Sequence, residues 1–270
     1  MKTEVEKLNN NNLYINSAFK DILKSNGINS AEDLWNFKGE SVKKQRKERG
    51  TERAFLKDKN GDILETYIKR YLPTSLKEKF KSFSSFHPVI IDGAFHEWEA
   101  IITFLGKDLP TMIPIAVAKT PLGTCNMTLG ITDYVRAEEL FKEFASNPTP
   151  ENKIRKRKLL KKIANLASSM HEAGFCHQDF YLVHIFVKTE EDDAIYLIDL
   201  QRLIIQKSLK IRWRIKDLGQ IYFSALPYIS KTDIIYFWKN YSTKYYRNKS
   251  LIKAVLAKAE RIKKHTEKKY

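Results

Sequence analysis

Two aspartates, Asp179 and Asp199, have the residue type and the surroundings that phosphoryl transfer requires. That reaction needs little covalent help from a protein; it needs an acceptor hydroxyl held in line and metal ions that neutralise the phosphate oxygens. A carboxylate on a fixed loop can receive the proton of the acceptor, and a second carboxylate at the end of a nearby strand can hold the metal. A short hairpin is predicted between the two, which suits this division of labour.

The segment around Asp179 is close to the catalytic loop of protein kinases, where a His-Arg-Asp run is followed by a metal-binding Asn five residues after the Asp. His177 and Asp179 match the first and third positions, Gln178 replaces the Arg, and His184 stands where the Asn would be. An imidazole can ligate a divalent cation, although Mg²⁺ prefers oxygen. Two interpretations of His184 stay open, a metal ligand or a hydrogen-bonded core histidine. Asp179 and Asp199 could also be ordinary turn and strand-end residues.

The elements that must position these residues follow from the spacing of apolar side chains. It predicts helices over 94–105 and 153–173 and strands over 53–56, 63–69 and 194–200. Asn60-Gly61 predicts a tight hairpin between the first two strands, and Gly174 is a natural end for the long helix. The order is therefore β-rich with one helix first, then predominantly helical, with the change near residues 133–137.

Composition limits the class of protein further. Among 270 residues, 48 Lys and Arg face 32 Asp and Glu, a net charge of +16 that attracts nucleic acid, phosphorylated lipid headgroups or an acidic protein without choosing among them. Two distant cysteines, Cys125 and Cys176, make neither a disulfide framework nor a metal-ligand spacing, so we expect reduced thiols. We expect no signal peptide and no membrane span, since the chain has neither the short nor the long apolar run these need.

Two stretches together resemble one known family. HEAGFCHQDFYLVHIFV (171–187) and YLIDLQR (196–202) are similar to the Kdo/heptose lipopolysaccharide kinase family, whose pattern runs H-x-x-G-x-x-H-x-D-F-Y-x-x-H and then L-I-D-L-x-R. The resemblance covers about 35–230. It implies an α+β fold of the bilobal, protein-kinase-like kind, with a small β-rich N-lobe and a mainly helical C-lobe. On this basis we expect an N-terminal extension over 1–34, a nucleotide-binding lobe over 35–135 and a catalytic lobe over 136–270.

The resemblance also assigns roles to individual residues. Lys69 would contact the nucleotide phosphates and Glu97 would pair with it, with Glu99 as the fallback. Asp179 would be the catalytic carboxylate, and His184 and Asp199 would hold Mg²⁺. His177 and Asp217 would support the catalytic loop. An interpretation of Lys69 as an exposed lysine stays open, because Lys57, Lys59 and Lys77 are nearby candidates for the same role. No glycine-rich phosphate-binding loop is recognisable, since Gly39 and Gly50 flank a basic stretch instead.

The resemblance implies an ATP- and Mg²⁺-dependent kinase acting on a sugar hydroxyl of the lipopolysaccharide inner core, heptose before Kdo. Its expected partners are the lipid A-linked glycolipid acceptor, an anionic inner membrane surface and an acidic protein. We expect a cytoplasmic protein, peripheral on the inner face of the inner membrane. Three alternatives stay open: a kinase for a protein or small metabolite, a pseudokinase, and a basic nucleic-acid-binding protein. The net charge supports the last alternative, but no recognised nucleic-acid-binding motif does.

Overall fold

The computed structural model describes residues 3–8, 10–42, 49–73, 93–242 and 248–268. The chain divides into two compact units, Met1–Thr132 and Asp133–Tyr270, near the lobe boundary expected after residue 135. Part of the basic stretch between Gly39 and Gly50 lies outside the described residues, and so does Lys77.

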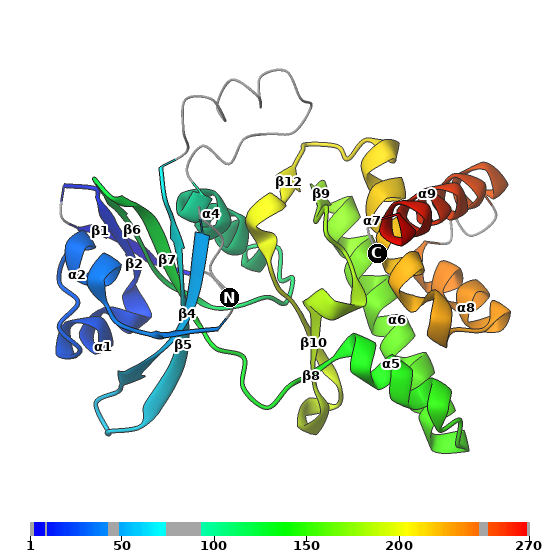
Figure 1. The fold of residues 1–270 in the computed structure, drawn as a ribbon, viewed down its shortest axis with the longest axis horizontal. Coiled ribbons are helices and arrows are strands. Elements are labelled where there is room, and N and C mark those ends of the chain that lie inside the picture. The colour runs from blue at the N-terminus through cyan, green and yellow to red at the C-terminus, as the bar shows by residue number, and fades with distance from the viewer. Residues whose placement is uncertain (1–2, 9, 43–48, 74–92, 243–247, 269–270) are drawn as a thin grey trace. The chain divides into compact units, whose positions relative to one another are not determined.

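The N-terminal unit is built, in its described residues, on an antiparallel sheet of seven strands in the order β1-β2-β6-β7-β5-β4-β3 (Figure 1). These strands are β1 (Val5–Leu8), β2 (Leu13–Asn16), β3 (Glu40–Ser41), β4 (Arg49–Lys57), β5 (Ile63–Tyr71), β6 (Pro114–Thr120) and β7 (Gly123–Leu129). β4 and β5 form the hairpin expected from the Asn-Gly pair. Asp58 closes the turn by accepting from the backbone N–H groups of Asn60 and Asp62, and Gly61 adopts a φ of 89°.

Helices pack on this sheet in two groups (Figure 1). They are α1 (Lys20–Ser25), α2 (Ala31–Asn36) and α4 (Gly93–Leu105), with a 3-10 turn at Ser17–Phe19. α1 and α2 supply Leu23 and Leu34 to the larger core, which contains Ile68 of β5. Trp98 of α4 packs instead with Tyr71 in a second cluster. Because neighbouring residues of a strand point to opposite faces, the residue between Ile68 and Arg70, Lys69, is on the α4 side of the sheet.

Residues 1–34 are expected from the sequence as an extension, but those of them that the structure describes, 3–8 and 10–34, take part in this unit. β2 pairs with β6 in the sheet, and Leu13, Ile15, Leu23 and Ile28 are buried in the larger core.

The C-terminal unit is mainly helical in its described residues. Its helices are α5 (Ala137–Ser146), α6 (Pro150–Glu172), α7 (Ile211–Ala225), α8 (Lys231–Tyr241) and α9 (Lys249–Glu267), and its strands are β8 (Val135–Arg136), β9 (Phe175–Cys176), β10 (Ile185–Lys188), β11 (Ala194–Leu197) and β12 (Ile204–Ile205). α6 is the long helix expected from the sequence. Thr149 caps it by accepting from the backbone of Asn152, and Pro150 occupies its first turn, where a missing N–H costs nothing.

None of the described helices is both long and apolar enough to cross a membrane.

Short strands carry the residues of chemical interest in this unit. β10 pairs with β11 and β8, so the hairpin expected between Asp179 and Asp199 is present. β9 pairs with β12, and Gly174, just before β9, has a φ of 87°. A Cβ at Gly174 would lie 1.8 Å from the carbonyl oxygen of Gln206, so only glycine allows the chain after Asp199 to lie this close to the start of the catalytic loop.

Candidate active site

In the N-terminal unit, Lys69 forms an ion pair with the buried Glu97. Lys69 Nζ lies 2.5 Å from Glu97 Oε1, and the side chains are 19% and 1% exposed. The other oxygen, Oε2, accepts from the hydroxyl of Tyr71 and from Nδ2 of Asn126, each at 2.9 Å. β5, β7 and α4 together therefore fix one carboxylate beside one ammonium group. Such a pair presents a positioned cation while its counter-charge stays out of water.

The competing residues named from the sequence do not share this arrangement. Glu99, the fallback partner, is exposed on α4. Lys57 and Lys59 are exposed at the end of β4 and in the hairpin turn. Arg70, next to Lys69, belongs to the opposite face, where it pairs with Glu52 at 2.8 Å and donates to the carbonyl oxygen of Trp35.

In the C-terminal unit, Asp217 of α7 holds the start of the catalytic loop, which we define as residues 177–184. Its carboxylate is fully buried and accepts from the backbone N–H groups of His177, at 2.8 Å, and Gln178, at 2.9 Å. His171 Nε2 lies 3.3 Å from the same group. Burial alone would raise the pKa of Asp217, but the hydrogen bond from His171 and the other donors outweigh it, so the pKa lies below its usual range. The position is that of the brace expected from the sequence.

His177 joins the catalytic loop to the segment that carries Asp199. Its Nε2 lies 2.9 Å from the carbonyl oxygen of Ile198, so this nitrogen carries the proton and donates it. Burial lowers the pKa of His177, which keeps the ring neutral. The ring therefore links the two segments, which is where the sequence-based prediction placed a supporting residue.

His184 and Asp199 lie side by side at the end of this linkage. His184 Nδ1 is 2.7 Å from the backbone oxygen of Asp179, so it donates there, and Nε2 is 4.0 Å from Asp199 Oδ2. The two side chains are 25% and 27% exposed. Nε2 of His184 and a carboxylate oxygen of Asp199 thus face each other across a short gap. No group of three or more His, Cys, Asp or Glu side chains that could hold a metal occurs among the described residues.

Asp179 is held by a residue that has no role among the sequence-based predictions. Arg202 Nη1 lies 3.1 and 3.0 Å from the two carboxylate oxygens of Asp179. Arg202 is the last residue of YLIDLQR, so its place in that motif was the available signal. The carbonyl oxygen of Arg202 in turn accepts from Gln178 Nε2 at 2.5 Å.

Gln220 of α7 is a second residue that sequence reasoning missed. Its Nε2 donates to the carbonyl oxygen of Gln178 at 2.6 Å, and its Oε1 accepts from the N–H of Phe180 at 3.2 Å. These bonds hold the backbone on both sides of Asp179. Gln178 has a φ of 70°, so this strained conformation of the loop depends on them. A lone glutamine on a predicted helix carries no recognisable pattern.

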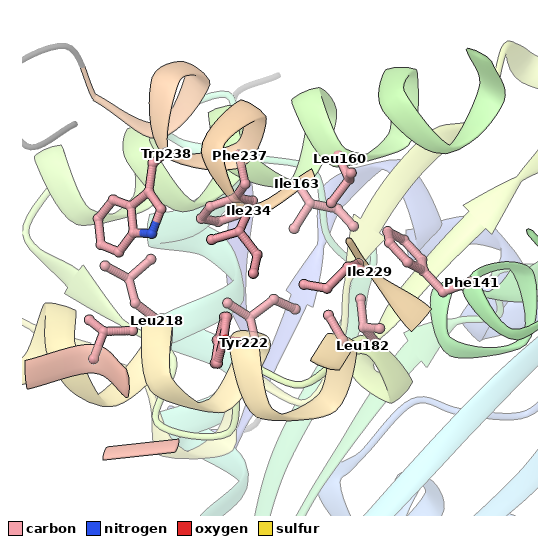
Figure 2. A pocket seen from close by; sticks show the side chains of 13 residues that line it. Phe141, Leu160, Ile163, Leu182, Leu218, Tyr222, Ile229, Ile234, Phe237 and Trp238 are labelled. Atoms are coloured by element: carbon pink, nitrogen blue, oxygen red, sulfur yellow. The ribbon is translucent and has the colours of Figure 1, made fainter. Parts of the chain in front are cut away.

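An apolar pocket lies deeper in the same unit, among the helices (Figure 2). It has a volume of about 30 Å³ and is lined by side chains that include Phe141, Ile163, Leu182 and Trp238. Leu182 belongs to the catalytic loop and points into this core, and its N–H donates to Ser224 of α7. None of the proposed catalytic side chains lines the pocket. The apolar side chains around it support the catalytic loop through Leu182.

Both cysteines are buried and unpaired. Burial raises the pKa of Cys125 to about 12 and also raises the pKa of Cys176, whose Sγ lies 3.3 Å from Asp217 Oδ1. Neither thiol is a nucleophile at neutral pH, because the thiolate is the reactive form.

Comparison with known proteins gives consistent results. A model of the "Lipopolysaccharide kinase (Kdo/WaaP) family" matches residues 32–241. The chain is 31% identical to the lipopolysaccharide core heptose(I) kinase WaaP of Escherichia coli K12 over 219 residues, covering 75% of this chain and 82% of that protein. It is 29% identical to the corresponding enzyme of Pseudomonas aeruginosa over 160 residues, 55% of this chain and 59% of that one.

A solved structure is also similar in fold. WaaP in complex with acyl carrier protein matches with a TM-score of 0.71 and 23% identity, over 92% of this chain and 98% of that chain. The α+β, protein-kinase-like fold expected from the sequence, β-rich in its amino-terminal part and helical in its carboxy-terminal part, is confirmed.

Proposed function

The chain belongs to the lipopolysaccharide kinase (Kdo/WaaP) family, and from that premise we propose that it transfers the γ-phosphate of ATP to a hydroxyl of heptose in the lipopolysaccharide inner core. The observation that supports this most directly is the double support of the catalytic loop. Asp217 holds the backbone before Asp179, and His177 ties the loop to the residue before Asp199. One rigid frame therefore carries both of the aspartates that phosphoryl transfer uses.

Asp179 is the group that receives the proton in this mechanism. It orients the sugar hydroxyl and accepts its proton as the oxygen attacks the γ-phosphorus in line with the leaving oxygen. Lys69, held by Glu97, binds the α- and β-phosphates and stabilises the negative charge of the transferred group. A fixed ion pair needs no reorganisation during the reaction.

His184 and Asp199 are the residues that would hold Mg²⁺. The proton on Nδ1 of His184 is committed to the backbone of Asp179, which leaves Nε2 facing Asp199. Mg²⁺ takes one or two protein ligands in nucleotide sites and obtains the others from phosphates and water. When bound, it neutralises charge on the phosphate oxygens.

The test is phosphate transfer from labelled ATP to dephosphorylated core oligosaccharide by wild-type protein and by Asp179→Asn. Removal of a positioned base lowers kcat by about 10²- to 10⁴-fold. Circular dichroism of both proteins controls for folding. Equal turnover by the two would exclude this role for Asp179, and transfer only to a protein or small-metabolite acceptor in a parallel panel would exclude the heptose assignment.

Peripheral binding to an anionic leaflet of the inner membrane follows from the nature of the acceptor, a lipid A-linked glycolipid. The segment over 205–212 supports this proposal. Ile205 and Ile211 are 48% and 49% exposed, and the exposed Lys207, Lys210 and Arg212 lie among them with no acidic residue. Protruding aliphatic side chains among cations suit an interface between acyl chains and anionic headgroups. The backbone bond from Gln206 N to the carbonyl oxygen of Gly174 holds this segment beside the catalytic loop.

An acidic protein is a further proposed partner. The structure similar in fold is that of WaaP in complex with acyl carrier protein, and this chain has a net charge of +16. We expect co-elution of the purified chain with acyl carrier protein in gel filtration at low salt. Separate elution at low salt would rule out this partner.

A further inference from the structure

Arg202 has hydrogen-bonding capacity that its contact with Asp179 does not use. Both bonds to Asp179 come from one nitrogen, Nη1. In the part of the chain that the structure describes, Nε and Nη2 of Arg202 donate to no other residue. The side chain is 36% exposed, so solvent or a ligand can reach it. A guanidinium group is a rigid fork whose remaining N–H groups match a carboxylate or a phosphate.

A second cation accompanies Arg202. Lys216 of α7 donates to Gln178 Oε1 at 2.8 Å, on the residue before Asp179. Its pKa is lowered by burial first and by the charge of Arg202 second, which places the two cations within reach of each other's fields. Asp217 adds little negative charge at the surface, because it is fully buried and saturated with donors. Arg202 and Lys216 therefore bring two positive charges to the single negative charge of the Asp179 carboxylate.

The position of these two positive charges has a chemical consequence. A ligand anion bound to Nε and Nη2 of Arg202 leaves Nη1 on Asp179 undisturbed. The planar guanidinium would then hold the carboxylate of Asp179 and the ligand anion at fixed positions relative to each other. An acceptor that carries an anionic group near its reacting hydroxyl would be aligned by that group.

We propose that Arg202, with Lys216 beside it, binds a carboxylate or phosphate of the acceptor and so selects the hydroxyl that reaches Asp179. The proposal rests on the kinase function proposed above and adds a specificity-determining contact to it. Loss of the contact distinguishes an acceptor anion from a nucleotide phosphate. It would raise the KM for the acceptor in the first case and the KM for ATP in the second.

The test measures kcat and both KM values for wild type, Arg202→Gln and Arg202→Lys on matched acceptors. All three acceptors lack the phosphate that the kinase adds: one is otherwise intact core oligosaccharide, one has its carboxyl groups reduced to alcohols, and one has its remaining phosphates removed enzymatically. Loss of a charge-assisted contact is expected to raise the KM for intact acceptor about ten- to hundredfold in Arg202→Gln, with less than about a twofold change in the KM for ATP. Arg202→Lys keeps the charge without the fork and should recover part of this loss. Arg261→Gln, which removes an exposed arginine of α9, is the control for net charge.

The acceptor that lacks the recognised anion identifies the ligand. On that acceptor wild type should show the same high KM, and Arg202→Gln should add nothing further. If Arg202→Gln lowers kcat equally on all acceptors with KM unchanged, Arg202 only positions Asp179 and the proposal is wrong. A rise in the KM for ATP would overturn it in favour of nucleotide phosphate. An active Asp179→Asn protein would instead overturn the kinase mechanism itself, so the two failures are distinguishable.

Discussion

At the scale of single residues, the Lys69–Glu97 pair allows a sharp test because α4 carries a matched control. Glu97→Gln removes the negative charge that fixes Lys69 and leaves Tyr71 and Asn126 donating to a neutral group. We expect kcat/KM for ATP to fall about a hundredfold, the size of effect seen when one positioned electrostatic contact is lost. Glu99→Gln, on the exposed face of the same helix, should change it less than about twofold. Equal effects of both substitutions would show that Glu97 has no special part in nucleotide binding.

Two buried histidines give the stability a pH dependence whose sign can be worked out. Burial lowers the pKa of His171 and of His177 in the folded protein. The unfolded chain takes up protons on these rings near their ordinary pKa of about 6.5, while the folded chain resists, so protonation favours unfolding. Their stability contribution is complete above about pH 6.5 and is lost as the pH falls toward the folded pKa values.

We therefore expect the free energy of unfolding to fall by up to about 2.7 kcal/mol per pH unit below pH 6.5, about 1.4 for each ring. Urea unfolding between pH 7.5 and pH 5 measures it. His171→Gln should roughly halve the slope, whereas His265→Gln, at an exposed position of α9, should leave it unchanged. A flat wild-type profile over this range would contradict the assignment of both rings as neutral.

At the scale of elements, the pairing of β9 with β12 depends on Gly174. Gly174 and Gly61 have φ values of 87° and 89°, but only Gly174 has an atom where a Cβ would stand. Gly61→Ala should thus cost about 1 kcal/mol of strain, whereas Gly174→Ala adds a collision with the backbone of Gln206 and should cost roughly 3 kcal/mol or more. Urea unfolding of the two variants gives the comparison. Similar losses would mean that the β9–β12 pair yields easily.

The elements also show where sequence patterns sufficed. Local spacing, turn residues and caps are enough to predict two hairpins, β4–β5 and β10–β11, and two helices, α4 and α6. The two-residue strands β8, β9 and β12 could not be predicted, because a pattern of two residues has no period. The part played by residues 13–34 in the core was likewise hidden, since α1 and α2 are too short for a clear amphipathic stripe.

At the scale of the whole molecule, the proposed membrane contact and the net charge of +16 together predict salt-sensitive binding to anionic membranes. Each Lys or Arg near an anionic leaflet contributes about 1 kcal/mol, so a Lys207, Lys210 and Arg212 triple alanine variant should bind roughly a hundredfold more weakly. Co-sedimentation with vesicles with and without phosphatidylglycerol, at low and high salt, measures this. Lys263→Ala with Lys264→Ala, exposed on α9, is the control. Binding that ignores lipid charge would refute the membrane proposal, and loss in the control alone would place the contact elsewhere.

The sequence by itself identified the side chains suited to phosphoryl transfer and the family. Acidic and imidazole side chains at fixed spacing along a short loop form a local pattern. Such a pattern can be recognised in the sequence without knowledge of the tertiary structure. The tertiary structure alone decided which partners these groups have: Glu97 and not Glu99 for Lys69, Arg202 for Asp179, and Gln220 for the loop backbone. These partners come from other elements, so their choice depends on packing and burial, which no spacing along the chain records.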